Sequence, residues 1–144
     1  MGDSKKKINE THLGFIQNVT DRMGQNSFHS KNWCVTVISA MVAFYLTQDA
    51  ATMRPVIAVT ACVVTILFSL IDAYYLHLER GYRYLYKVAA QLVEDSTVKD
   101  FSMSRPKRYK GFKKYIEALF SVSTGLFYLV ILIGIIILYV MTSI

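Results

Sequence analysis

The chain has 144 residues, the length of a single domain, and 53% of them are hydrophobic. This fraction and the positive mean hydropathy exceed those of an ordinary soluble domain, so they argue against a soluble protein and predict a membrane protein. In a membrane protein, the net charge of +6 favours contact with anionic lipid head groups.

Residues 1–32 are polar, and we predict a cytoplasmic amphipathic helix here. The first apolar run begins too far along the chain for a cleaved signal peptide, so this helix should run on into a first membrane span. A bend at Gly24 or at Asn26 and Ser27 is left open. A stripe at helical spacing marks the apolar side of this helix: Leu13, Ile16, Thr20, Met23 and Ser27.

Two apolar runs follow, at residues 33–46 and 56–71, and a short polar turn separates them. Each is shorter than the roughly 20 residues that cross the hydrocarbon layer, so polar flanks must complete each helix. We assign residues 33–76 to a transmembrane helical hairpin. Cys34 and Cys62 lie inside it without a second cysteine or histidine at ligand spacing, and we interpret both as packing residues, with no metal site.

Residues 77–114 are predicted to extend the second helix into the cytoplasm, to about Leu92, and then to form a basic loop. Strong helix formers dominate the first part, and Glu79 and Arg83 stand four residues apart. The aromatic residues at the ends of the hairpin are interpreted as interface anchors: Trp33, Tyr74, Tyr75 and Tyr82. The loop supplies an expected anionic-lipid patch: Arg105, Lys107, Arg108, Lys110, Lys113 and Lys114.

Residues 118–144 carry no charge and exceed the length that a spanning helix requires. They predict a third transmembrane helix over residues 115–144, continuous from Phe112. All of the 16 basic residues except Arg54 lie before the first span or between the second and third. By the positive-inside rule the N-terminus is cytoplasmic and the C-terminus lies outside. The predicted fold is an all-α integral membrane protein with three transmembrane helices and cytoplasmic extensions of helices one and two.

The hairpin predicts which polar residues meet at the membrane edge. If its turn is centred near residues 51 and 52, the numbers of facing residues sum to about 103, which places Lys31 level with Asp72 and Arg22 level with Glu79 to Tyr82. An aspartate at the hydrocarbon margin is costly unless it is paired. We name six residues the polar seam: Arg22, Asn26, Lys31, Asp72, Glu79 and Arg83. The polar seam either locks the hairpin together or lines the mouth of an oligomeric pore.

Two sequence blocks support a family resemblance. Residues 22–33, RMGQNSFHSKNW, and residues 72–80, DAYYLHLER, resemble the R-M-x-x-N-S-F-x-x-K-x-W and D-A-Y-Y-L-x-x-E-R motifs of a family of small, uncharacterised bacterial inner-membrane proteins. More distantly, the size and layout resemble the pore-forming membrane accessory protein of type VI-B CRISPR loci. These resemblances imply the bacterial inner membrane, a homo-oligomeric pore and a role in antiviral defence.

Three functions follow as hypotheses. The first is a homo-oligomeric effector that permeabilises the membrane in anti-phage defence. The second is a non-conducting membrane anchor that recruits a cytoplasmic defence partner. The third is a membrane-bound ribonuclease of the HEPN type, since Arg22 and His29 match its loose Arg-x4–6-His spacing. We expect no cofactor and no enzyme, and the basic loop favours lipid over nucleic acid.

Overall fold

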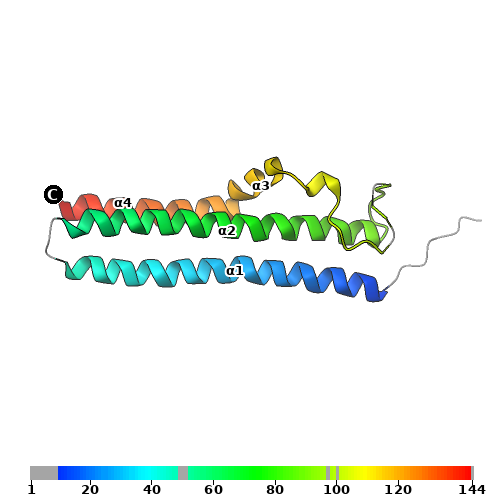
Figure 1. Ribbon diagram of the computed structural model, residues 1–144, viewed down its shortest axis with the longest axis horizontal. Helices are drawn as coiled ribbons and strands as arrows, with labels where there is room; N and C mark the ends of the chain where they lie inside the picture. The colour runs from blue at the N-terminus through cyan, green and yellow to red at the C-terminus, as the bar shows by residue number, and fades with distance from the viewer. Residues whose placement is uncertain (1–9, 49–51, 97, 100, 144) are drawn as a thin grey trace, which may run out of the picture.

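The computed structural model describes residues 10–48, 52–96, 98–99 and 101–143, and every structural statement below concerns these residues. The described part contains helices and irregular segments but no strand, so the predicted all-helical class is confirmed. The helices form a long, narrow molecule in which the C-terminus lies at the same end as the turn between the first two helices (Figure 1).

Two long antiparallel helices form the body of the molecule. Helix α1, Glu10–Thr47, and helix α2, Met53–Ala89, lie side by side along nearly their whole length (Figure 1). Helix α1 is uninterrupted because no proline interrupts its hydrogen bonds, and Gly24 does not break it. Helix α2 carries Pro55 in its first turn, where the missing N–H group is not needed.

Helix α2 ends at Ala89, slightly earlier than the predicted end near Leu92. Gln91 adopts a left-handed backbone conformation with φ of 58°, which turns the chain away from the helix axis. The N–H group of Gln91 donates to the carbonyl of Val88 at 3.0 Å, and that of Leu92 donates to the carbonyl of Lys87 at 2.9 Å. These two hydrogen bonds form a Schellman cap, which satisfies carbonyls at the helix end.

The prediction of one continuous helix from Phe112 to the C-terminus is wrong. The chain forms instead a short helix α3, Phe112–Leu119, a π-helical turn η2, Val122–Leu126, and a longer helix α4, Phe127–Ser143. Ser121, between α3 and η2, is extended, with φ of −72° and ψ of 156°.

Backbone hydrogen bonds at Ser121 explain the break. Its carbonyl accepts the N–H groups of Thr124 at 3.2 Å and Gly125 at 2.6 Å, so the next helix starts again from this residue. A Cβ atom at Gly125 would lie 3.4 Å from the carbonyl oxygen of Leu119, which is an ordinary van der Waals contact, so the space alone does not require glycine. The break falls in the short polar stretch SVSTG, residues 121–125, which contains no charge and no proline.

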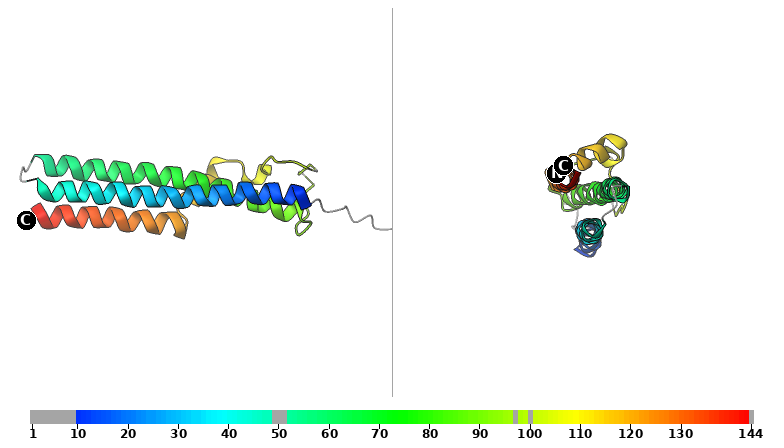
Figure 2. Two further views of the ribbon diagram at one scale, coloured as in Figure 1. Left: turned by 90° about the horizontal axis from the view of Figure 1, so that it is seen from below. Right: turned by 90° about the vertical axis from the view of Figure 1, so that its left-hand side faces the viewer.

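Helix α2 lies between the other elements. It contacts α1 on one side, and α3, η2 and α4 on the other; a 3-10 turn, η1 (Lys107–Tyr109), also lies against it. The end-on view in Figure 2 shows this order, with α1 and α4 separated by α2. Because α4 packs mainly on α2, most of the surfaces of α1 and α4 have no neighbour within the chain.

A small apolar core joins the three long helices. It consists of Cys34 and Ile38 from α1, Ala61 from α2, and Tyr128 and Ile135 from α4. Cys34 is fully buried, as expected of a packing residue.

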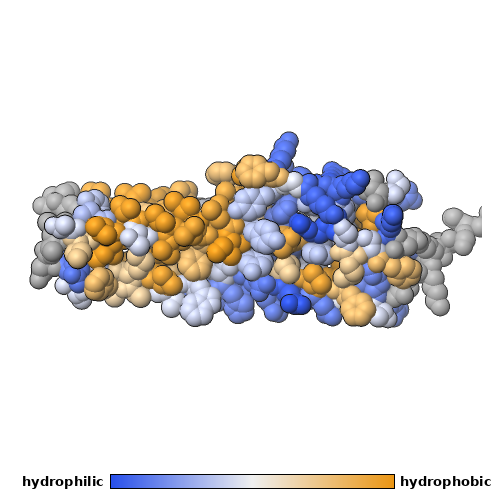
Figure 3. Space-filling model, viewed as in Figure 1, coloured by the Kyte–Doolittle hydropathy of each residue, from blue (hydrophilic) through white to orange (hydrophobic). Residues whose placement is uncertain are grey.

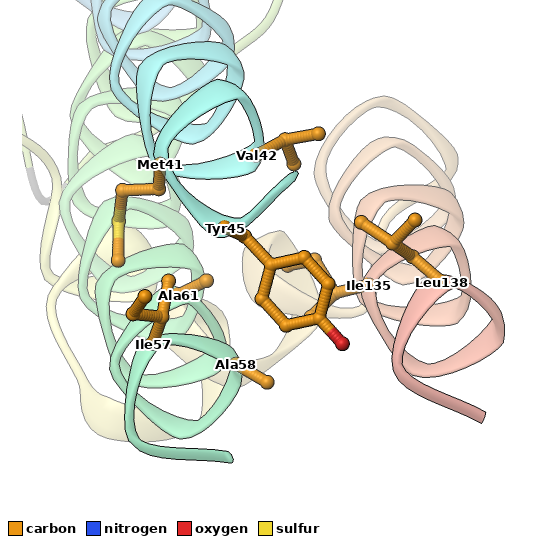
Figure 4. Close-up of a pocket in the computed structure, with 8 residues that line it drawn as sticks. All are labelled: Met41, Val42, Tyr45, Ile57, Ala58, Ala61, Ile135 and Leu138. Atoms are coloured by element: carbon orange, nitrogen blue, oxygen red, sulfur yellow. The ribbon is translucent and has the colours of Figure 1, made fainter. Parts of the chain in front are cut away.

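Nearer the C-terminus, the same helices enclose a small apolar pocket (Figure 4). The ring of Tyr45 crosses this pocket, and its hydroxyl group forms a hydrogen bond with Thr142 of α4. The remaining residues that line it are Met41, Val42, Ile57, Ala58, Ala61, Ile135 and Leu138. This hydrogen bond ties the far end of α4 to α1.

On the face that Figure 3 shows, exposed apolar side chains predominate over the half of the molecule that contains α4, while hydrophilic side chains with scattered apolar ones occupy the other half. We call this surface, between the levels of Arg54 and Asp72 on α2, the apolar belt. Helix α2 and the helical segment Val122–Thr142 are long and apolar enough to cross a membrane, and only 22% and 17% of their most apolar windows are buried. Most of these apolar side chains therefore face outward.

The predicted first span, in α1, is not confirmed by length and composition, so the prediction of three spans stands at two. Helix α1 is long enough, but its apolar run does not reach the hydropathy of the other two. The physical reason is the polar side chains that interrupt the run: Asn32, Thr36, Ser39 and Thr47.

Candidate functional site

The edge of the apolar belt contains a buried cluster of charged and hydroxyl side chains. Asp72 of α2 is fully buried, and its carboxylate lies 2.6 Å from the ammonium group of Lys31. Ser27 donates a hydrogen bond to the other carboxylate oxygen, and Thr124 of η2 donates to the first at 3.4 Å. We call Ser27, Lys31, Asp72 and Thr124 the Asp72 cluster. The Asp72 cluster joins α1, α2 and η2.

The register of the hairpin brings this cluster together. The ion pair of Lys31 with Asp72 follows the predicted pairing, and the Lys31 ammonium also donates to Ser27 at 3.2 Å. Ser27 and Lys31 stand four residues apart, so one helical face presents both to Asp72. Buried charges cost free energy unless they are paired and hydrogen-bonded, and here each carboxylate oxygen has a donor.

Sequence reasoning missed two members of the cluster. Ser27 could have been found, because it lies one turn before Lys31 on the same face of α1. Thr124 could not, because it reaches Asp72 only through the break at Ser121. A continuous third helix would have given no reason to place Thr124 at this level.

Two further buried hydroxyl groups follow from the same break. The side-chain oxygens of Ser121 and Tyr128 are buried and have no hydrogen-bond partner among the described residues. Tyr128 lies one turn beyond Thr124, on the same face of the third helical segment. The junction of η2 with α4 therefore carries more hydrogen-bonding capacity than the described residues use.

A second polar contact lies further from the apolar belt. Glu79 is buried, and its carboxylate pairs with Arg83 at 2.6 Å on its own helix. This carboxylate lies against Gly24 of α1, where a Cβ atom would be in ordinary contact with it at 3.6 Å. Arg22, the expected partner, lies exposed, and Asn26 is half-buried. Of the polar seam, then, Lys31 and Asp72 form the pair that joins the two helices.

The remaining predicted anchors and catalytic candidates lie on the surface. Trp33 and Tyr74 are 63% and 51% exposed at the edge of the belt, and Tyr75 and Tyr82 are half-buried. His29 is exposed, and its ring lies beside that of Phe28. Arg22 and His29 therefore both lie on the exposed surface of α1, and the described residues of one chain do not bring them together in a catalytic site.

The outer surface of α1 carries an unbroken line of small and polar side chains. At the level of the belt we call these residues the polar stripe: Asn32, Thr36, Ser39, Ala43 and Thr47. All are exposed, and their spacing of three to four residues places them on one face of the helix. The hydroxyl of Thr36 donates to the carbonyl of Asn32, and that of Thr47 to the carbonyl of Phe44. Small and polar groups are thus presented where the neighbouring surfaces are apolar.

The same face continues beyond the belt with mostly polar residues. They are Gly14, Asn18, Asp21, Gln25 and His29, and all are exposed. The face opposite to α2 is therefore hydrophilic along the whole of α1.

The basic loop folds against the part of α2 that lies beyond the apolar belt. The stem of Arg105 crosses Gly81, where a Cβ atom would lie 2.9 Å from the Arg105 Cδ atom. Lys110 donates to Ser104 at 2.8 Å, and Lys114 pairs with Glu117 at 2.6 Å. The hydrogen bond from Lys114 lowers the pKa of the Glu117 carboxyl. The other cations of the predicted patch are exposed: Lys107, Arg108 and Lys113.

The described residues hold no group of three or more histidine, cysteine, aspartate or glutamate side chains that could bind a metal ion. No protein-family model, no curated protein and no solved structure matches the chain.

Proposed function

We propose that this chain is a three-span protein of the bacterial inner membrane that forms a homo-oligomer and raises the permeability of that membrane. The observation that carries the proposal is the polar stripe of α1, which lies exposed at the level of the apolar belt. The N-terminus is cytoplasmic in this proposal and the C-terminus outside, because the basic residues gather at one end of the hairpin.

The packing of α1 on α2 supports a membrane span in α1, which would be the third span of the chain beside those in α2 and α4. Since the two helices are antiparallel and in contact along their length, a membrane crossed by α2 also encloses the part of α1 beside it. That part contains the exposed apolar side chains Val35, Phe44 and Leu46. Its polar stripe lowers the mean hydropathy without removing the apolar flanks.

The polar stripe then requires an explanation. Hydroxyl and amide groups that face lipid lose their hydrogen bonds to water, although Thr36 and Thr47 compensate in part through the helix backbone. A stripe that runs the depth of the belt is best satisfied if it faces water. One chain with three membrane segments cannot enclose water, but several copies around an axis can.

The Asp72 cluster supports a structural role within each protomer. Asp72 and Glu79 are buried between helices, so neither carboxylate reaches the outer face of α1. Of the two interpretations of the polar seam, the geometry favours the one in which Asp72 locks the hairpin together. In this proposal the polar stripe lines the pore instead. Uncharged hydroxyl and amide side chains predict weak selectivity between ions.

Purified full-length protein in lipid vesicles tests the proposal through ion flux and dye release. Replacing Asn32, Thr36 and Ser39 by leucine should abolish flux while leaving the oligomer intact. The matched control replaces Val63, Ile66 and Ile71, which are exposed on α2 at the same level, by leucine and should conduct as the wild type does. A chain that stays monomeric in the membrane, or a leucine stripe that conducts normally, would refute the proposal.

The defence setting rests on the family resemblance, and its test is separate. Infection of cells that carry the gene should depolarise their membrane, and the leucine stripe should prevent this. A potential that stays unchanged through infection would remove the defence role.

A non-conducting anchor is the second candidate, favoured by the cytoplasmic ends of α1 and α2. These continue well beyond the belt and expose Phe15 and Phe28. A monomeric mass in detergent together with a co-purifying cytoplasmic partner would support it. The ribonuclease hypothesis predicts that His29→Ala abolishes RNA cleavage and leaves assembly unchanged.

A further inference from the structure

Helix α3 presents an apolar face outward. Its buried side, at Ala118, packs toward α2, and the hydroxyl of Tyr115 donates to the carbonyl of Leu70 at 3.0 Å. Phe112 at its start and Phe120 directly after its end are 77% and 79% exposed, and the exposed charged residues Lys113 and Glu117 lie beside them. A short helix that hides one side and exposes aromatic rings beside charged groups is amphipathic in the sense that suits a membrane surface.

The position of this helix matches the edge of the bilayer in the proposed orientation. Tyr115 bonds to a carbonyl just before Asp72, the residue that marks the end of the apolar belt. Val122, which follows the break, is 81% exposed and continues the apolar surface onto α4. Figure 3 shows this surface passing from α4 to α3, with strongly hydrophilic side chains beside it.

The cations beside α3 are short of anionic partners. Residues 105–117 contain six basic side chains and one acid, Glu117, which already pairs with Lys114. Arg108 and Lys113 are exposed, and one terminal nitrogen of Arg105 is buried without an acceptor among the described residues. Arg105 and Arg80 also lower the pKa of His77, in addition to the larger effect of its burial, which places further positive charge close to this loop.

From this arrangement we infer that α3 and the basic loop bind an anionic phospholipid. Arg105, Arg108 and Lys113 hold the phosphate of the head group, and the acyl chains lie against Phe112, Phe120 and Val122. The source of the phosphate is the lipid and not a soluble phosphate, because the apolar face adjoins the cations. The inference rests on the membrane location in the proposed function but not on permeation.

Native mass spectrometry of the full-length protein in detergent tests this site with phosphatidylglycerol and phosphatidylcholine as probes. We expect selective binding of phosphatidylglycerol. The variant Arg105→Met, Arg108→Gln, Lys113→Gln should weaken that binding about 100-fold, since a surface cation contributes about a fivefold preference for anionic lipid. Methionine keeps an apolar stem across Gly81, and circular dichroism checks that the helices persist.

The matched control is Lys87→Gln with Lys99→Gln, which removes two exposed cations outside the proposed lipid site. It should leave binding within about twofold of the wild type. Equal loss in this control, or equal binding of the two lipids, would overturn the site. Full competition by inorganic phosphate would overturn the lipid as its source. A protein that binds phosphatidylglycerol but conducts no ions would keep this inference and defeat the proposed function.

Discussion

The side chain of Asp72 has the strongest local constraint in the molecule. It is fully buried, and its three partners come from α1 and η2. A buried ion pair is often no more stabilising than apolar packing, but the loss of one partner leaves the other charge unpaired. The lysine side chain is 17% exposed, so water relieves part of that penalty.

Asp72→Ala is therefore expected to destabilise the protein by about 3 kcal/mol, at the lower end for a broken buried pair, measured by unfolding in detergent mixtures. The charge swap Lys31→Asp with Asp72→Lys should recover part of the stability that either single change loses. Glu117→Gln, at an exposed pair, serves as the control and should have no measurable effect. A swapped variant no more stable than the single ones would show that the two charges do not interact.

These residues also show what could be predicted. Lys31 and Asp72 follow from the short turn and the antiparallel arrangement alone, because the register is set by geometry. The same register gives the position of Arg22 along the helix axis but does not predict that its side chain faces away from Glu79. Register fixes the position of a residue along the axis and not its rotation about it. Thr124 needed the break in the third helix, which falls in the stretch SVSTG at residues 121–125; serine, threonine and glycine are weak helix formers, but they do not by themselves predict that the helix stops.

At the scale of elements, the docking of α3 on α2 depends on His77. This side chain is buried, and its ring lies against that of Tyr115, with centroids 6.4 Å apart. Burial first, and then the charges of Arg105 and Arg80, lower its pKa from the usual 6.5, although a hydrogen bond to the Lys114 backbone opposes this. The docked state thus favours the neutral imidazole.

Acidification is expected to weaken the docking of α3 on α2. Because the pKa of His77 is lower when α3 is docked than when it is free, docking is fully favoured above 6.5 and weakens as the pH falls from there through the lowered value. Spin labels at Lys87→Cys and Lys113→Cys, in a chain without Cys34 and Cys62, should report a broader distance distribution at about pH 5 than at about pH 7.5.

His77→Phe keeps an aromatic ring against Tyr115 but cannot titrate. Its distance distribution should be the same at both pH values, so a variant that still broadens on acidification would assign the effect to another group. The sequence indicated a loop and a helix here, but not that the helix would fold back, since α3 depends on contacts with α2 that lie far away in the chain.

For the whole molecule, composition and charge predicted the helical class and the two strongly apolar segments, because both depend on average properties of long stretches. The first apolar run is a weaker span by the same averages. Its polar residues are not scattered but lie on one face, and only the packing of α1 on α2 shows that this face points outward. The arrangement turns a weak span into a candidate lining for a shared water path.

Thiol accessibility measures that central claim most directly, without any activating signal. In a chain with Cys34→Ala and Cys62→Ala, single cysteines are placed at Thr36 and Ser39 on the polar stripe, and at Leu67 and Val63, which are exposed on the apolar belt at matched levels of α2 and face lipid in the proposed function. The thiolate, which forms in water and not in hydrocarbon, is the species that reacts with membrane-impermeant thiol reagents. The account predicts that Thr36→Cys and Ser39→Cys react at least about tenfold faster than the two lipid-facing variants. Equal and slow reaction at all four positions would contradict it, because the polar stripe would then face no water.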